Sequence, residues 1–380
     1  MIAVIADDLT GAVEIAGIGL RYGLRVDIVS TLDQSCDADL LVIATDTRSM
    51  PEQKAVETMA AITAKIKTFN PQFLFKKVDS VLRGHVLAEL NVHLKELGLA
   101  KALLIPANPA LGRTLTNGQY FVNGQPIHQT SFANDPDFAI TGADVPTLLR
   151  CDKNAITIQT VNGTLSQTGI TVGECVTEND LKQWANKVDN QTLLAGGSSF
   201  FAAILGASGY TEQAKQHIYP FEKPALFISG TTYDKSRQLI SQLKADGGPV
   251  SYMPKDIIAL ANPTENLYDQ WADEVVALLN RHNKAIVAID ENTANAAGNL
   301  RQKQALLVEK VLKKITVKEL LIEGGATASA IIKQLNLDSF TPVQEFSTGV
   351  IRMRSAQKDG LFLTMKPGSY NWPAQVWDLY

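Results

Sequence analysis

The sequence predicts an α/β protein of two domains, each a mostly parallel sheet flanked by helices, with a cleft between them. At 380 residues the chain is longer than one hydrophobic core usually serves. Continuously apolar runs alternate with segments of helical periodicity, the pattern of a parallel sheet that is covered on both faces. Residues 207–224 lack clear periodicity, and the alternation starts again after them. We therefore place a first domain at residues 1–215 and a second at residues 222–380.

The first half opens on a strand at Ile2–Ala6, because an unbroken apolar run suits a strand that is buried on both faces. A polar loop at Asp7–Gly11 follows, and then apolar residues recur at helical spacing up to Gly23. Asparagine–glycine pairs at 117–118 and 123–124 indicate a β-ribbon. The other strands expected in this half are 25–30, 40–44, 73–77, 103–106, 155–160, 170–172 and 193–195. The other expected helices are 51–69, 86–97, 178–188 and a small-residue helix after Gly197.

The second half repeats this pattern. A strand at Ala225–Ile228 leads into the loop Ser229–Thr232 and the helix Asp234–Ala245. A later strand, Glu319–Ile322, runs into a glycine-rich loop and then a helix at Ala328–Leu335. The remaining strands are expected at 285–289, 349–353 and 361–365, and the remaining helices at 265–281 and 302–314.

Composition excludes several classes of partner. The formal net charge is -4 and basic residues are scattered, which argues against nucleic acid, since duplex binding needs a basic surface. The cysteines form no CxxC pair and indicate free thiols in a reducing compartment. No apolar run reaches about 18 residues and no signal peptide is visible, so we expect no membrane partner and a cytoplasmic location. The sequence leaves the oligomeric state open, a homo-oligomer included.

Two aspartates, Asp7 and Asp8, follow the first predicted strand directly. Open parallel sheets bind ligands beyond the carboxyl ends of their strands, so this loop is a candidate site. Adjacent carboxylates repel each other and need hydrogen-bond donors, which the hydroxyls of a polyol substrate provide. The alternative interpretation is that Asp8 or Thr10 caps the following helix, which accounts for one acidic residue but not for the pair.

A second strand-end loop contains Lys77, Asp79 and Ser80, followed by Arg83. Arg83 has the fork geometry that holds a carboxylate in two hydrogen bonds, and Lys77 supplies a mobile point charge. An acid substrate would suit these cations. The alternative is a solvent-facing Lys76 beside a local ion pair between Asp79 and Arg83.

The segment 106–114 carries two prolines and Arg113. Composition alone favours a rigid turn with a surface arginine over a second contact for an anion.

In the second half, the loops 229–232 and 324–327 each join a strand to a helix through small residues. Main-chain N–H groups and the helix dipole would favour phosphate oxygens at such junctions. One such glycine-containing loop is more often a tight turn than a nucleotide-binding loop. The presence of two in one domain favours nucleotide binding only modestly more. The segment 366–369 offers another tight stretch of backbone. Neither a GxxxxGK[ST] loop nor a GxGxxG loop after a strand occurs.

Three segments resemble the four-carbon acid sugar kinase family and occur in the family's order. They are IADDLTGA, FKKVDSVLRGHVLAEL and IPANPALGRTLTNGQYFVNGQPIHQT with FANDP, and they cover roughly the first 140 residues. The second half is more loosely similar, and its SGTT, GGAT and KPGS loops fall where the family places its ATP-binding loops. Ala326 stands where an acidic residue is common, and residues 367–370 replace a more glycine-rich form.

The resemblance implies an enzyme that uses ATP and Mg²⁺ to phosphorylate the terminal hydroxyl of a four-carbon acid such as threonate, erythronate or an oxo-tetronate. It implies that the acid-sugar site is lined by Asp7, Asp8, Lys77, Asp79, Ser80, Arg83 and Gly84. It implies that ATP is held by Ser229, Gly324, Gly325, Ala326, Thr327 and Gly368.

We expect in-line phosphoryl transfer across the cleft, with catalytic roles for Asp8, Asp79 and Arg83. Arg83, together with Lys77, would neutralise the substrate carboxylate. One carboxylate among Asp7, Asp8 and Asp79 would orient or deprotonate the attacking hydroxyl, and another would contact Mg²⁺, with the metal ligand left unassigned. Two other classes remain open: a non-catalytic sugar-acid sensor with a decayed nucleotide site, and a nucleotide-dependent dehydrogenase. The absence of GxGxxG argues against the dehydrogenase.

Overall fold

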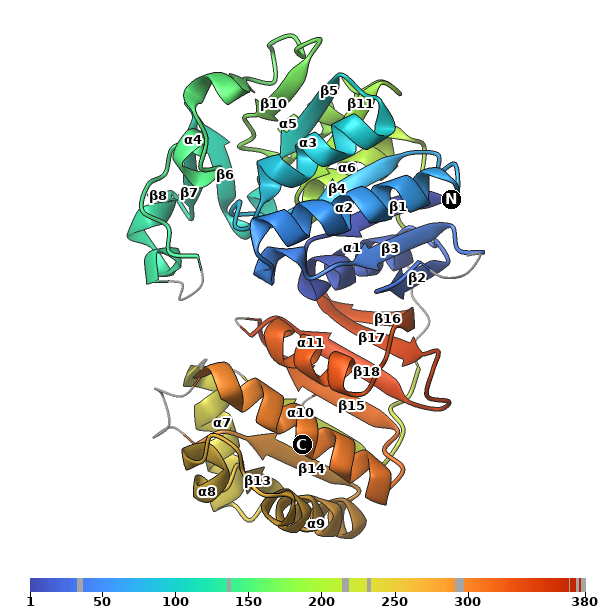
Figure 1. Cartoon of the computed structure of the whole chain (residues 1–380), viewed down its shortest axis with the longest axis vertical. Coiled ribbons are helices and arrows are strands. Elements are labelled where there is room, and N and C mark those ends of the chain that lie inside the picture. The colour runs from blue at the N-terminus through green and yellow to red at the C-terminus, as the bar shows by residue number, and fades with distance from the viewer. Residues whose placement is uncertain are drawn as a thin grey trace. The chain divides into compact units, whose positions relative to one another are not determined.

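The computed structural model describes residues 1–32, 37–134, 138–213, 219–230, 234–290, 297–368, 370–373 and 376. The chain divides into two compact units, Met1–Ala214 and Lys215–Tyr380. Each unit is a sheet flanked by helices (Figure 1), so the expected two-domain α/β class is confirmed.

The first unit is built on a parallel sheet. Its strands lie in the order β2-β3-β1-β4-β11-β5-β10-β9, and every neighbouring pair is parallel. Strands β1 and β3 consist of apolar residues, all buried except the half-buried Ala44, because helices cover both faces of the sheet. The bounds are β1 Ile2–Ala6, β2 Val26–Val29, β3 Leu40–Ala44, β4 Leu74–Lys77, β5 Lys101–Ile105, β9 Ile156–Gln159, β10 Gly169–Gly173 and β11 Thr192–Gly196.

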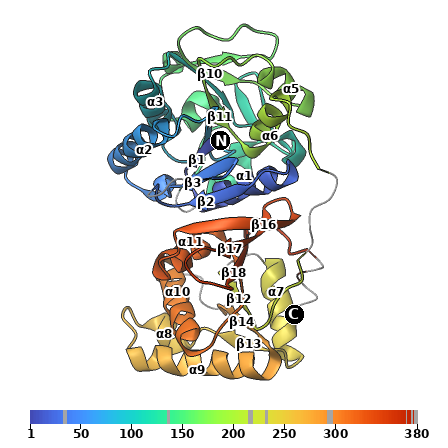
Figure 2. The ribbon, with the colours of Figure 1, turned by 90° about the vertical axis from the view of Figure 1, so that its right-hand side faces the viewer.

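Helices α2 and α3 cover one face of this sheet, and α1, α5 and α6 cover the other (Figure 2). Their bounds are α1 Leu9–Arg21, α2 Glu52–Lys67, α3 Val86–Leu97, α5 Glu178–Ala185 and α6 Ser198–Ala207, with a short α4 at Val145–Leu148. Helix α1 begins at Leu9, whereas the sequence predicted a polar loop that continues to Gly11. The reason is local: the Asp8 side chain accepts a hydrogen bond from the Gly11 N–H at 2.7 Å and caps the helix.

The predicted β-ribbon is present as a separate antiparallel sheet of β6 (Arg113–Thr116), β7 (Gln119–Val122) and β8 (Gln125–Pro126). Asn117 and Gly118 have φ of 50° and 68°, and Asn123 and Gly124 have φ of 50° and 78°. Both pairs therefore take the left-handed conformation that a two-residue hairpin turn requires.

The second unit has the strand order β13-β14-β12-β15-β18-β17-β16. It is parallel up to β18, and β17 and β16 continue it antiparallel. Helices α10 and α11 lie on one face and α7 on the other (Figure 2). The strands are β12 Ala225–Ser229, β13 Val250–Tyr252, β14 Lys284–Ala288, β15 Glu319–Glu323, β16 Ser339–Ser347, β17 Val350–Ser355 and β18 Phe362–Lys366. The helices are α7 Asp234–Ala245, α8 Lys255–Ala259, α9 Glu265–His282, α10 Ala297–Lys314 and α11 Gly325–Gln334.

Two strands of this unit, β13 and β16, were not predicted. Strand β13 spans only three residues, which is too short for a periodic signal. Strand β16 alternates buried and half-buried residues, so it lacks the unbroken apolar run of its parallel neighbours. Helix α11 starts at Gly325 rather than at the predicted Ala328. Within the described ranges, no helix is both long and apolar enough to span a membrane.

Candidate active site

The first candidate site lies at the carboxyl ends of β1, β3 and β4. Strand β1 pairs with β3 on one side and β4 on the other, so that Ala6 stands beside Ala44 and Lys77. The chain visits β2 and β3 on one side of β1 and then crosses to β4 on the other. Such a reversal of strand order leaves a crevice beyond the strand ends. The loops that follow Ala6, Ala44 and Lys77 therefore meet at one place.

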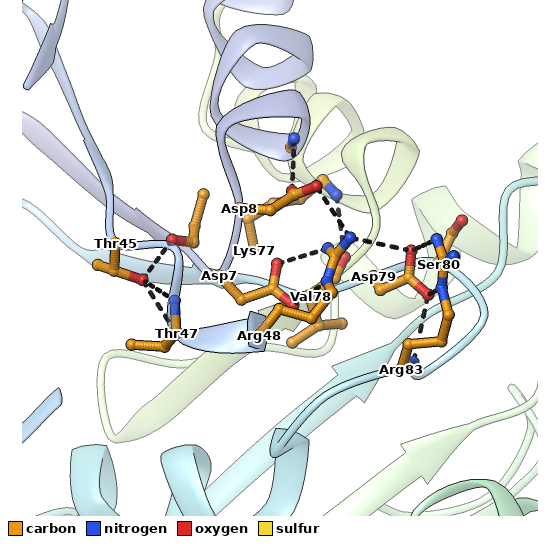
Figure 3. A network of polar contacts seen from close by, with 12 residues as sticks. Asp7, Asp8, Thr45, Thr47, Arg48, Lys77, Val78, Asp79, Ser80 and Arg83 are labelled. Atoms are coloured by element: carbon orange, nitrogen blue, oxygen red, sulfur yellow. Dashed lines mark hydrogen bonds and ion pairs between the residues drawn. The ribbon is translucent and has the colours of Figure 1, made fainter. Parts of the chain in front are cut away.

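Arg48, in the loop that follows β3, occupies the centre of this site (Figure 3). Its Nε and Nη2 atoms donate to the two carboxylate oxygens of Asp7 at 3.0 and 2.8 Å, and its Nη1 atom donates to Asp8 at 2.8 Å. The same guanidinium lies 3.9 Å from Asp79. Burial would lower the pKa of Arg48, but the surrounding carboxylates outweigh it and raise that pKa well above its usual value. The aspartates therefore share a permanent positive charge.

Asp79 is fixed by a second arginine, Arg83. The Arg83 side chain donates to both oxygens of Asp79 at 2.8 and 2.9 Å, and the Arg83 main-chain N–H donates at 3.2 Å. Burial alone would raise the pKa of Asp79, but Arg83 and Arg48 hold it well below its usual value. Asp79 is thus ionised at neutral pH. The local ion pair that the sequence left as an alternative is present.

The adjacent lysines of β4 point to opposite faces of the sheet, because side chains alternate along a strand. Lys77 faces the site, where its Nζ donates to the Val78 carbonyl at 2.9 Å and lies 3.7 Å from Glu14. Lys76 is fully buried on the other side and forms a 2.5 Å ion pair with Glu89. The part of the alternative interpretation that placed Lys76 toward solvent is therefore wrong.

Two glycines allow close approach at this site. Gly84 has φ of 92°, a left-handed conformation, and a Cβ there would lie 3.2 Å from the Arg48 side chain. A Cβ on Gly11 would lie 2.8 Å from Asp8 Oδ1 and 3.1 Å from Lys77 Nζ. The predicted acid-site residues Asp7, Asp8, Lys77, Asp79, Ser80, Arg83 and Gly84 are thus brought together at one edge of the sheet.

The second candidate site lies at the carboxyl ends of β12 and β15. These strands pair in parallel with Ser229 beside Glu323. A Cβ on Gly230 would lie 1.9 Å from Thr327 Oγ1, so the two loops touch only because residue 230 is glycine. Gly324 has φ of 103°, and its N–H donates to the Lys366 carbonyl at 3.0 Å. The loops of three strands therefore meet here as well.

A buried carboxylate, Glu323, ties these loops together. It accepts hydrogen bonds from Ser236 at 2.5 Å, from Ser229 at 3.4 Å and from Lys366 Nζ at 2.5 Å. Lys366 Nζ also donates to the Gly368 carbonyl at 3.4 Å. Burial lowers the pKa of Lys366 although Glu323 opposes that change.

The first turn of α11 consists of Gly325, Ala326 and Thr327. The hydrogen-bond ladder of the helix starts with the bond from the Ala328 N–H to the Gly324 carbonyl at 3.0 Å, so the ladder does not use the amides of residues 325–327. Free amides at the positive end of a helix dipole are suited to phosphate oxygens. The predicted nucleotide-site residues Ser229, Gly324, Gly325, Ala326, Thr327 and Gly368 thus share one strand-end region, whereas Thr231, Thr232 and Ser369 lie outside the described residues.

Comparison with protein families decides the identity of these units. A model described as a sugar-binding N-terminal domain matches residues 2–204, and one described as a nucleotide-binding C-terminal domain matches residues 226–370. The chain belongs to the four-carbon acid sugar kinase family. Membership makes this acid sugar kinase a phosphotransferase that acts on an alcohol group.

Relatives of this acid sugar kinase match it over most of its length. It is 24% identical to a D-threonate kinase of Salmonella typhimurium, over 89% of this chain and 87% of the relative. It is 25% identical to a 3-oxo-tetronate kinase of Brucella melitensis, over 98% and 93%. A Haemophilus influenzae structure, 21% identical, matches with a TM-score of 0.76 over 99% of this chain and 98% of that one. A Salmonella typhimurium structure, 19% identical, matches with a TM-score of 0.79 over 97% and 96%, which supports the same fold.

Sequence reasoning missed Arg48, the residue at the centre of the first site. A signal was present: Arg48 follows the correctly predicted strand 40–44, so the rule of strand carboxyl ends applies to its loop as well. Sequence reasoning also assigned no role to Glu323 or Lys366. Their pairing was not predictable, because 43 residues separate them in sequence.

The site residues can be tested for fit to Mg²⁺. Magnesium prefers oxygen ligands and is usually held by one or two carboxylates together with substrate phosphates. Asp7, Asp8 and Asp79 supply carboxylates, but all three already interact with Arg48. Among the residues that the structure describes, no group of three or more His, Cys, Asp or Glu side chains could hold a metal ion. One or two of these carboxylates would therefore serve as Mg²⁺ ligands, and the remaining oxygen ligands would come from other groups.

Proposed function

We propose that this enzyme transfers the γ-phosphoryl group of ATP to the terminal hydroxyl of a four-carbon acid of the threonate, erythronate or 3-oxo-tetronate type. The observation that carries the proposal is the cluster of Asp7, Asp8 and Asp79 around Arg48. Carboxylates paired with cations offer acceptors for the hydroxyls of a polyol and cations for its carboxylate. The names of the relatives support the four-carbon acids as the class to test.

The exposed fraction of each side chain distinguishes the residues that would contact substrate from the residues that would hold those contact residues in place. The Asp8 side chain is 20% exposed, whereas those of Asp7 and Asp79 are 5% and 9% exposed. Arg83 is 24% exposed, compared with 12% for Arg48. We assign Asp8 to the attacking hydroxyl and Arg83, with Lys77, to the substrate carboxylate. Asp7 and Asp79 would hold the two arginines in place.

In the reaction, the Asp8 carboxylate accepts the proton of the terminal hydroxyl as that oxygen bonds to the γ-phosphorus. The bond from the γ-phosphorus to the leaving oxygen of ADP breaks in line with the attack. Main-chain amides at the start of α11 would hold phosphate oxygens that gain charge. Mg²⁺, when bound, supplies further neutralisation of that charge. Arg83 and Lys77 would fix the other end of the acid, so that the terminal hydroxyl is the end left to accept the phosphoryl group.

The cytoplasm is the compartment we propose, because ATP is available there and the cysteines Cys151 and Cys175 are free thiols.

The proposal is tested by an ATP-consumption screen over D- and L-threonate, D- and L-erythronate and their 3-oxo forms, with glycerate as a shorter control. We expect ADP release that depends on at least one four-carbon acid, and a phosphorylated acid of the corresponding mass. Release of ADP without any acid dependence would contradict the proposal.

Two substitutions test the assigned roles. Asp8→Asn should lower kcat by about 100-fold or more with a small change in KM, because it removes the proton acceptor. Arg83→Ala should raise KM for the acid by about 10-fold and leave KM for ATP unchanged. Asp152→Asn, at an exposed position of the same unit, is the matched control. Near-normal kcat in Asp8→Asn would show that another group accepts the proton.

A further inference from the structure

Arg113 is not the surface arginine that its sequence context favours. It is half-buried at the start of β6, and its Nη1 atom donates a hydrogen bond to the hydroxyl of Ser80. The main chain beneath it is held on both sides, since the Arg113 N–H donates to Asn108 at 3.0 Å and the Asn108 N–H donates to Arg113 at 2.8 Å. The anchored Arg113 side chain therefore contacts the first candidate site, although it lies 33 positions after Ser80 in the sequence.

A second residue of the ribbon reaches the same serine. Tyr120, on β7, is fully buried and donates its hydroxyl hydrogen to the Ser80 carbonyl. Burial raises the pKa of Tyr120, so the phenol stays protonated and remains a donor. The main chain of Leu115 also pairs with Cys175, which fixes the ribbon to the rest of the unit. Ser80 is therefore held through both its main chain and its side chain.

The directions of these hydrogen bonds leave the hydroxyl hydrogen of Ser80 available for a further bond. A guanidinium has donors only, so the Ser80 oxygen must be the acceptor from Arg113. The hydroxyl retains a single hydrogen of its own, and within the described ranges no other residue is bonded to that hydroxyl. An oxygen that accepts from a cation is also a stronger donor, because the bond polarises the O–H group.

Arg113 and the proposed carboxylate-binding residue Arg83 both contact the ring of Phe132. The guanidinium of Arg113 lies 5.8 Å from the centre of the Phe132 ring, and that of Arg83 lies 5.7 Å from the same centre. Ser80 and Arg83 also belong to one loop, with Asp79 fixed between the strand end and Arg83. The unused hydroxyl hydrogen of Ser80 and the half-buried guanidinium of Arg83 thus belong to the same cluster of donors.

We propose that Arg113 is a positioning residue for acid recognition: it orients the Ser80 hydroxyl so that this group donates to the substrate carboxylate beside Arg83. The inference rests on the proposed function for the class of ligand, and it adds the ribbon 113–126 to the specificity-determining part of the site. A neutral sugar of the same length would give the Ser80 hydrogen and Arg83 no charged acceptor. Discrimination between acid and sugar would therefore depend on Arg113.

The test is a double-mutant cycle read by calorimetric binding of the tightest four-carbon acid of the panel to the intact chain without nucleotide. Arg113→Met and Ser80→Ala should each weaken binding by about 10-fold, the scale of one hydrogen bond to a charged group. The double variant should be weakened by about 10-fold as well, not about 100-fold, because both changes remove one interaction. Arg113→Lys should recover part of the loss. Arg150→Met, which removes an exposed arginine from the Phe138 ring, is the matched control and should bind normally.

Multiplicative losses in the double variant would show that Arg113 does not act through Ser80 and would overturn the inference. Unchanged acid binding in Arg113→Met would overturn it too. Neither result contradicts the proposed function if the wild-type enzyme still consumes ATP in the presence of the acid. Conversely, a wild-type enzyme that binds the acid with the expected coupling but transfers no phosphoryl group would contradict the proposed function alone.

Discussion

At the scale of single residues, Lys76 and Lys77 show how much one position along a strand changes the role of a side chain. Both are lysines on β4, yet Lys77 belongs to the candidate site and Lys76 forms a buried ion pair with Glu89. Next to that pair, His93 accepts or donates a 2.7 Å bond with Thr63, and burial lowers its pKa well below its usual value. The buried polar contacts of Lys76 and His93 thus form a structural network on the face of β4 that is opposite to the candidate site.

The same substitution at the two lysines should affect different properties, mainly stability at Lys76 and mainly kinetics at Lys77. Lys76→Met leaves the Glu89 carboxylate buried without its partner and should destabilise the protein by about 3 kcal/mol. Lys77→Met should lower kcat/KM for the acid by about 10-fold with a smaller loss of stability. Urea unfolding and steady-state kinetics of both variants measure the difference. If Lys76→Met unfolded at the wild-type urea concentration, the buried pair would contribute nothing to stability.

At the scale of elements, the proposed nucleotide site depends on how closely two strand-end loops approach. Gly230, after β12, lies against Thr327 in the first turn of α11. Gly230→Ala would place a methyl group where the Thr327 hydroxyl now lies and should force the loops apart. We expect KM for ATP to rise by about 10-fold with KM for the acid unchanged. Gly206→Ala, on an exposed helix position with open space around it, is the control and should leave both constants unchanged. A normal KM for ATP in Gly230→Ala would argue against ATP binding by these loops.

A second element-scale prediction concerns the other end of β15. Glu319 is buried and pairs with Arg352 of β17. Burial raises the pKa of Glu319 to about 7, against the opposing effects of the Glu222 N–H and of Arg352. Because the folded pKa exceeds the unfolded value near 4.5, the folded state binds more protons between these values, and stability falls as pH rises through this window.

We therefore expect the urea midpoint to decrease between about pH 4.5 and 7, and Glu319→Gln to reduce that slope. Glu274→Gln, on the exposed side of α9, is the control and should keep the wild-type slope. An unchanged slope in Glu319→Gln would assign the pH dependence to other groups.

At the scale of the whole molecule, the two candidate sites belong to different units, so their ligands should protect different parts of the chain. Hydrogen exchange of the intact protein should slow at peptides containing residues 7–11, 45–50 and 78–84 when the acid is added. A non-hydrolysable ATP analogue should slow exchange at 229–230, 324–327 and 366–368. Protection of the first set by the nucleotide alone would reverse the assignment of the units. An analogue that protected neither set would favour the sugar-acid sensor.

The amino-acid sequence by itself determined the α/β class, the order of most strands and helices, and the strand-end loops that carry the candidate residues. Those features depend on local periodicity and on turn residues such as the asparagine–glycine pairs, which are visible within a few positions. Helix starts were less predictable, because the Asp8 cap and the Gly324 conformation move them by a few residues.

Only the tertiary structure decided which charges meet. Asp7, Arg48 and Asp79 come from three separate loops and become neighbours because the parallel register sets Ala6 beside Ala44 and Lys77. The same holds for Arg113, whose contact with Ser80 spans 33 positions of sequence. The energy of a charge depends on burial and on the partner that faces it, and neither quantity is a property of the local sequence.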